Sequence, residues 1–124
     1  MMIRTWDLPI KAEWHRASEL KSLSFSLDNK LTLLLLEEDS QKCWRLHFPQ
    51  VQGFKWTTQE SGMWGAVLKS LPATGAFYEV VDSPWLLELG HGVVHYMEHA
   101  KHYVICSYDE YVEVVATRYS IEEC

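Results

Sequence analysis

Alternation of hydrophobic and polar residues in several short segments predicts β-strands with one buried face. Residues 22–27 alternate strictly, which predicts a strand whose apolar side chains point inward (Leu23, Phe25 and Leu27). Residues 31–36 are apolar at all but one position, which predicts a central strand covered on both faces. The Asp-Asn-Lys sequence between these segments favours a tight turn, so the two strands should form a hairpin.

Five further segments read as strands, at residues 43–48, 51–58, 76–81, 102–107 and 111–117. In the second of them the alternation changes phase at Gly53, which predicts a β-bulge. The short polar turns between consecutive strands favour antiparallel pairing. We therefore expect an α+β fold, with a mainly antiparallel curved sheet or small open barrel of about seven strands and one or two short helices.

The clearest helix signal lies at residues 83–90. Ser83 is suited to the N-cap, Pro84 fits the first helical position, and Gly90 ends the helix. A second short helix is considered at residues 12–19. It is also considered within residues 60–75, where apolar residues including Trp64 lie at helical spacing but two glycines weaken the pattern.

Length, charge and cysteine content narrow the class of protein. The chain has 124 residues, which predicts a single domain over residues 1–124. The net charge of −6 argues against nucleic acid or an anionic membrane as the main partner. The longest apolar stretch, residues 33–36, is far shorter than the roughly 20 residues of a membrane span. Three cysteines without a pairing pattern, and no apolar leader, predict a soluble cytoplasmic protein.

Four histidines within twelve residues are the only cluster of possible metal ligands: His91, His95, His99 and His102. On a helix the first three would share one face. The Gly90-His91-Gly92 sequence disfavours a helix there, and no known zinc spacing is matched. The chain also has no nucleophile elbow and no phosphate-binding glycine loop. We expect no metal, no cofactor and no catalytic residue set.

Aromatic and acidic residues offer a candidate contact surface. The chain has 6 Trp and 6 Tyr, residue types that are enriched at protein-binding hot spots. Trp85 on the capped helix is a candidate exposed anchor; burial beneath that helix is the alternative. The final hairpin combines Tyr with carboxylates, which suits a basic partner. The predicted partner-binding residues are Asp82, Trp85, Glu88, Tyr108, Asp109, Glu110, Tyr111 and Glu113.

The second half of the chain resembles small bacterial immunity proteins of polymorphic or contact-dependent toxin systems. The resemblance rests on the Asp82-Ser83-Pro84-Trp85 patch and on the strand-like segments at 102–105 and 112–116. It implies a protein that binds a cognate toxin in the cytoplasm and blocks it, and it carries over no catalytic residues. An acidic inhibitor would be attracted to a basic toxin.

The alternative is a small-molecule-binding protein or enzyme with a pocket on the sheet. Its walls would be aromatic, and His47 or His102 would act as an acid or base. The aromatic residues considered for this pocket are Trp44, Phe48, Trp56 and Tyr78.

Overall fold

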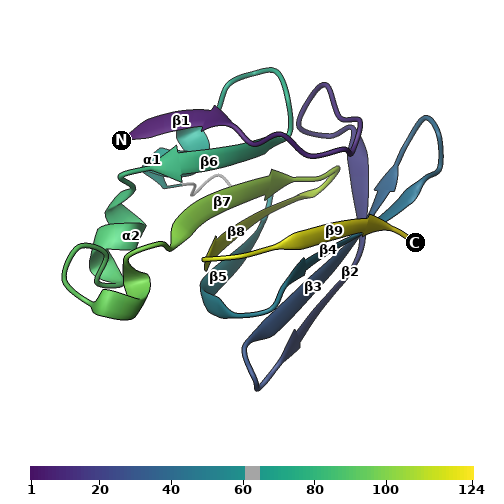
Figure 1. Ribbon diagram of the computed structural model, residues 1–124. Helices are drawn as coiled ribbons and strands as arrows, with labels where there is room; N and C mark the ends of the chain where they lie inside the picture. The colour runs from purple at the N-terminus through teal and green to yellow at the C-terminus, as the bar shows by residue number, and fades with distance from the viewer. Residues whose placement is uncertain (61–64) are drawn as a thin grey trace.

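The computed structural model describes residues 1–60 and 65–124, and this part of the chain forms two antiparallel sheets (Figure 1). The five-stranded sheet has the order β1-β6-β7-β8-β5, and the four-stranded sheet has the order β2-β3-β4-β9. The strands are β1 (Met2–Thr5), β2 (Ser18–Ser26), β3 (Lys30–Glu37), β4 (Cys43–Phe48), β5 (Val51–Thr58), β6 (Phe77–Val81), β7 (Lys101–Cys106), β8 (Glu110–Ala116) and β9 (Ser120–Glu123). The helices are α1 (Ala66–Lys69), α2 (Pro84–Glu88) and the 3-10 turn η1 (His95–Met97).

The expectation of a mainly antiparallel fold with short helices is confirmed. In place of one curved sheet or small open barrel there are two sheets, and the expected strand number is wrong. The described residues form two separate sheets with nine strands instead of about seven. The two strands that the pattern missed, β1 and β9, are four residues long and pair with β6 and β4 respectively. Segments this short carry too few alternating positions to be recognised before their partners are known.

The main core lies between the two sheets. Strand β3 contributes Leu31, Leu33 and Leu35, each fully buried, and β7 and β8 contribute side chains from the other side. The outer face of β3 is only half-buried, so the prediction that this strand is covered on both faces is wrong. Leu27, predicted to point inward, is 99 % exposed because it lies beyond the end of β2 in the turn to β3. Phe25 is exposed as well.

The central strands of the five-stranded sheet are the ones covered on both faces. Every β8 residue after Glu110 is buried, and so is every β7 residue after Lys101. One face packs against the four-stranded sheet. The helical segments lie beside the other face (Figure 1), where Leu86 and Met97 pack on Val115.

Local signals in the sequence located several features correctly. The Ser83 hydroxyl accepts a hydrogen bond from the Leu86 amide at 3.0 Å, and Gly90, with a φ of 100°, follows the end of α2. The pairing of β5 with β8 shifts register between Val51 and Gly53, which confirms the bulge. Residues 12–19 form no helix, in contrast to the expectation. In the 60–75 segment α1 forms, whereas Trp64 lies outside the described residues.

We predict that Leu35→Ala lowers the free energy of unfolding by about 2–5 kcal/mol, because it empties part of the core between the sheets. Leu34→Ala, on the half-buried outer face of the same strand, is the matched control and should cost clearly less. Urea titration of both variants measures the difference. Equal losses of unfolding free energy would contradict the conclusion that the core lies against the Leu35 face of β3.

Candidate functional site

The predicted partner-binding residues fall in two places at opposite ends of β7. Tyr108, Asp109 and Glu110 follow the last residue of β7. Asp82, in the turn before α2, and the α2 residues Trp85 and Glu88 lie near the first residues of β7. Tyr111 and Glu113 are only 5 % and 7 % exposed. These two residues present almost no side-chain surface to a partner, so we do not include them in the candidate surface.

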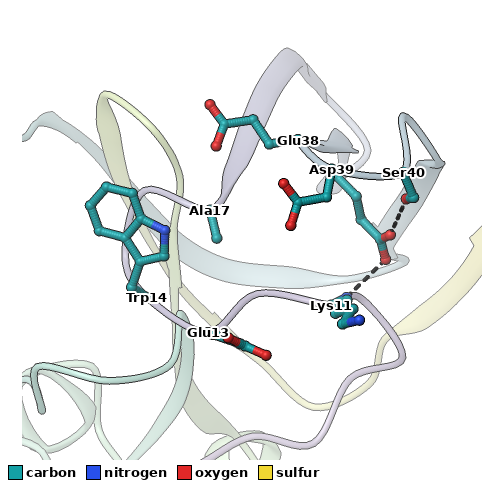
Figure 2. A pocket seen from close by; sticks show the side chains of 8 residues that line it. Lys11, Glu13, Trp14, Ala17, Glu38, Asp39 and Ser40 are labelled. Carbon is teal, nitrogen blue, oxygen red and sulfur yellow. Dashed lines mark hydrogen bonds between the residues drawn. The ribbon is translucent and has the colours of Figure 1, made fainter.

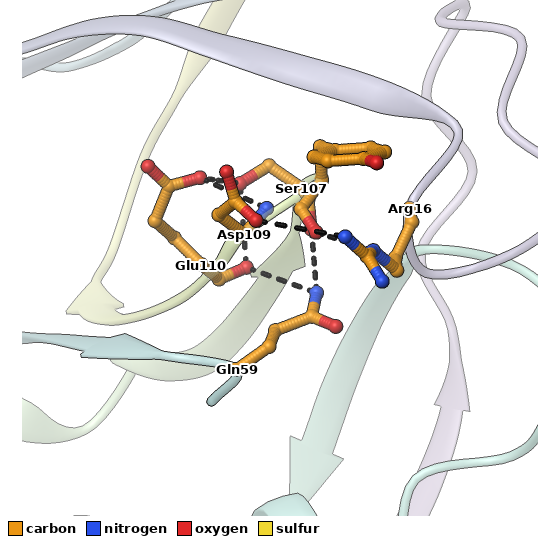
Figure 3. A network of polar contacts seen from close by, with 6 residues as sticks. Arg16, Gln59, Ser107, Asp109 and Glu110 are labelled. Carbon is orange, nitrogen blue, oxygen red and sulfur yellow. Dashed lines mark hydrogen bonds and ion pairs between the residues drawn. The ribbon is translucent and has the colours of Figure 1, made fainter. Parts of the chain in front are cut away.

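The turn at residues 108–110 is held by a network of polar contacts (Figure 3). The Arg16 guanidinium lies 4.0 Å from the centre of the Tyr108 ring, donates to the Tyr108 carbonyl at 2.7 Å, and is 3.6 Å from the Asp109 carboxylate. The Ser107 hydroxyl donates to the Glu110 carboxylate at 2.8 Å, and the Gln59 side-chain amide donates to the Ser107 carbonyl. These contacts fix the turn against the 12–17 segment and leave the Tyr108 ring 41 % exposed.

A buried carboxylate, Glu37 at the end of β3, joins Lys11, which precedes that segment, to the loop that follows β3 and to β4. It accepts hydrogen bonds from the Lys11 amide at 2.8 Å, from the Trp44 indole at 3.0 Å and from the Ser40 hydroxyl. Burial alone would raise the pKa of Glu37. These three hydrogen bonds, assisted by the positive charge of Lys42, outweigh burial and lower that pKa below its ordinary value.

The segments joined by Glu37 enclose an open pocket of about 360 Å³ (Figure 2). A second hollow of about 330 Å³ adjoins it and shares the Glu38 side chain. Figure 2 shows carboxylates and one tryptophan ring around the first pocket. We call the acidic side chains outside Glu37 and the aromatic rings that line the two hollows together the acidic surface: Glu13, Trp14, Glu19, Glu38, Asp39, Tyr108, Asp109 and Glu110.

Sequence reasoning found three of these eight residues. Trp14 is 51 % exposed, yet residues 1–20 fit no regular period, so the pattern gave it no orientation. Glu38 and Asp39 lie in the loop after β3, and their approach to residues 13–17 depends on long-range contacts such as the hydrogen bond from the Glu38 amide to the Ala17 carbonyl. The one local signal was the clustering of carboxylates in the loop after β3.

Trp85 lies outside the acidic surface and packs beside His102 and Lys55. It is half-buried and is therefore not the exposed anchor that the sequence suggested. Its ring meets the His102 ring edge-on at 5.2 Å between centres, and the Lys55 ammonium lies 4.1 Å from its centre. The buried His102 contacts the Glu113 carboxylate through Nε2 at 2.9 Å, and its Nδ1 has no hydrogen-bond partner among the described residues. These side chains border a pocket of about 350 Å³ between α1 and α2, together with Glu88.

The aromatic residues considered for the alternative pocket do not line one cavity. Phe48 and Tyr78 are buried in the core, and Trp56 is exposed. The Trp44 indole is committed to Glu37, and His47 is 2.8 Å from the Thr32 hydroxyl. From that set His102 borders the pocket beside Trp85.

Three of the four clustered histidines lie near Glu98, and the fourth is buried. His91 and His95 border one hollow with Glu98, and His91 and His99 border another with the same carboxylate. The His95 ring lies 3.7 Å from Glu98, whereas His102 is buried against Glu113. Within residues 1–60 and 65–124, no three His, Cys, Asp or Glu side chains are grouped closely enough to hold a metal ion.

Comparison with known protein families, with curated proteins and with solved structures finds no match to this chain. In the part of the chain that the structure describes, no helix combines the length and the apolar character needed to cross a membrane.

We predict that Glu37→Gln lowers the free energy of unfolding by about 1–3 kcal/mol at pH 7, because it weakens hydrogen bonds to a buried charge. A carboxylate with a lowered folded-state pKa stabilises the fold above its unfolded pKa and loses that contribution as pH falls through the folded value. The difference in unfolding free energy between the wild type and Glu37→Gln should therefore shrink below about pH 4.

Urea titrations at pH 7 and at about pH 3.5 measure that gap. Glu38→Gln, at the neighbouring exposed carboxylate, is the control and should stay within about 0.5 kcal/mol of wild type. A gap that is independent of pH would show that the Glu37 charge does not stabilise the fold.

Proposed function

We propose that the protein binds a basic partner protein through the acidic surface, as a cytoplasmic immunity-type inhibitor of a cognate toxin domain. The observation that carries the proposal is the meeting of six carboxylates and two exposed aromatic rings at two adjoining hollows. Three basic side chains lie among or beside them, Lys11, Arg16 and Lys21. The surface therefore keeps an excess of negative charge.

The two kinds of side chain support two different steps of binding. An excess of one charge accelerates encounter with an oppositely charged partner and does so most strongly at low salt. Partly exposed Trp and Tyr rings are suited to anchor a complex after encounter, because they bury a large area with few rotatable bonds. Trp14 and Tyr108 are partly exposed in this way, Trp14 at the first hollow and Tyr108 at the second.

The test compares two charge reversals of equal size. Glu38→Lys with Asp39→Lys alters the acidic surface, and Glu88→Lys with Glu98→Lys alters the exposed carboxylates near α2 and η1 by the same total charge. A basic partner captured from the source cells should associate at least about tenfold more slowly with the first variant than with the second. That difference should shrink as salt is raised.

Neutralisation is tested with the same partner. Expressed alone, it should be toxic to bacteria; co-expressed with the wild-type chain it should not be, and the Glu38/Asp39 variant should protect less than the Glu88/Glu98 variant. Equal effects of the two variants on association would refute the acidic surface as the binding site. A harmless partner would refute the immunity assignment while leaving the surface in place.

A second candidate function is binding of a small molecule in the pocket beside Trp85. The specific observation is the buried His102, whose Nδ1 has no hydrogen-bond partner in the described part of the chain and whose side chain borders a cavity that also carries Lys55 and Glu88. A small-molecule screen by thermal shift tests it. A ligand that raises the melting temperature of the wild type but not of Lys55→Ala would support this function over the first.

We predict that Trp85→Ala mainly destabilises the fold, by about 3 kcal/mol, because the ring packs on His102 and lies where a Cβ on Gly53 would come within 3.1 Å. Trp14→Ala should instead leave stability almost unchanged and speed dissociation of the partner. Thermal melts and dissociation kinetics separate these effects. Faster dissociation from folded Trp85→Ala, with none from Trp14→Ala, would restore Trp85 as the anchor.

A further inference from the structure

Two of the three cysteines lie opposite each other across the pairing of β4 with β9. The ladder pairs Trp44 with Glu123 and Arg45 with Glu122, and the Cys124 amide continues it by donating to the Cys43 carbonyl at 2.9 Å. Residues directly opposite in an antiparallel ladder place their side chains on the same face. The Cys124 thiol is near enough to Cys43 to raise the pKa of the Cys43 thiol.

The backbone at these positions is compatible with a disulfide. Opposite residues joined by a ladder hydrogen bond have Cα atoms about 5.5 Å apart. Disulfides span Cα separations of about 4.4–6.8 Å, with the commonest values near 5.5–6 Å. Closing the bond therefore requires rotation of the two side chains and no movement of the strands.

We propose that Cys43 and Cys124 form a reversible disulfide, so that the ladder between β4 and β9 is an oxidative modification site for low-molecular-weight disulfides such as glutathione disulfide. The third cysteine, Cys106, is fully buried in β7, where burial raises the pKa of its thiol. A buried thiol held in its protonated form is a poor nucleophile, so Cys106 does not take part.

The order of the exchange follows from exposure. Cys124 is exposed and Cys43 is half-buried, and the contact with Cys124, together with burial, raises the pKa of Cys43. The Cys124 thiolate attacks one sulfur of glutathione disulfide and releases one glutathione. Cys43 then loses its proton to solvent, attacks the Cys124 sulfur of the mixed disulfide and releases the second glutathione. The two protein thiols lose two electrons and two protons, and one glutathione disulfide is reduced to two glutathiones.

The bond would fasten a strand that few other contacts hold. β9 has four residues and, among the described strands, lies at the edge of its sheet beside β4. Ile121 packs against the main core, and the ion pairs of β9 are made by exposed side chains, Arg45 with Glu122 and Lys42 with Glu123. Exposed ion pairs add little to stability. Oxidation should therefore slow amide exchange in β9 and raise the melting temperature by roughly 5 °C or more.

The experiment incubates the full chain at low micromolar concentration with excess glutathione disulfide, followed by thiol blocking and mass spectrometry. The product should be a monomer two hydrogens lighter than the dithiol. Tryptic digestion should yield the peptide Cys43–Arg45 linked to the peptide that begins at Tyr119, whereas Cys106 should be recovered alkylated. Reduction should restore the dithiol and the lower melting temperature.

Variants test the order of attack without relying on stability. Cys43→Ser should accumulate one glutathione on Cys124, and Cys124→Ser should take up glutathione at least about tenfold more slowly. Cys106→Ala should form the disulfide like the wild type. The proposal is overturned if the wild type gives only stable glutathione adducts, only cross-linked dimers, or a bond that includes Cys106.

Discussion

Strands β7 and β8 lie at the centre of the five-stranded sheet with side chains buried on both faces, so each face needs an apolar cover. The four-stranded sheet covers one face with leucines of β3 and with Phe48. The turns and short helices between β5 and β7 cover the other. The capped helix and the hairpins supply this apolar cover. The bulge at Gly53 leaves space for the Trp85 ring, which packs beside the same sheet.

Burial also takes two carboxylates out of water, and each of them has partners within the fold. Glu113, in the middle of β8, pairs with His102 on β7. Glu37, at the end of β3, collects three neutral hydrogen-bond donors from three segments. An unpaired buried carboxylate would be very costly. The first arrangement ties together the consecutive strands β7 and β8. The second joins Lys11, Ser40 and Trp44 through Glu37 and builds the wall of the acidic surface.

Features that depend on neighbouring residues were predictable from the sequence. The β2–β3 hairpin, the Ser83 cap and the bulge follow from turn, cap and alternation chemistry within a few residues. The doubly covered strand was assigned to the wrong segment for a physical reason. Residues 31–36 look fully apolar, whereas β8 carries a glutamate whose burial makes sense only when His102 is seen beside it. The meeting of Trp14 with Glu38 depends on the same kind of distant contact through Glu37.

The acidic surface also has an energetic consequence in the free protein. Carboxylates brought close together repel one another, and such repulsion destabilises the compact state. Arg16 offsets part of it at the 108–110 turn, and Lys21 offsets part at Glu19. No basic residue is recorded in an ion pair with Glu38 or Asp39 within the described residues. A partner that supplies cations at these two carboxylates would relieve repulsion that the fold tolerates alone, so binding there couples to stability without any change of backbone conformation.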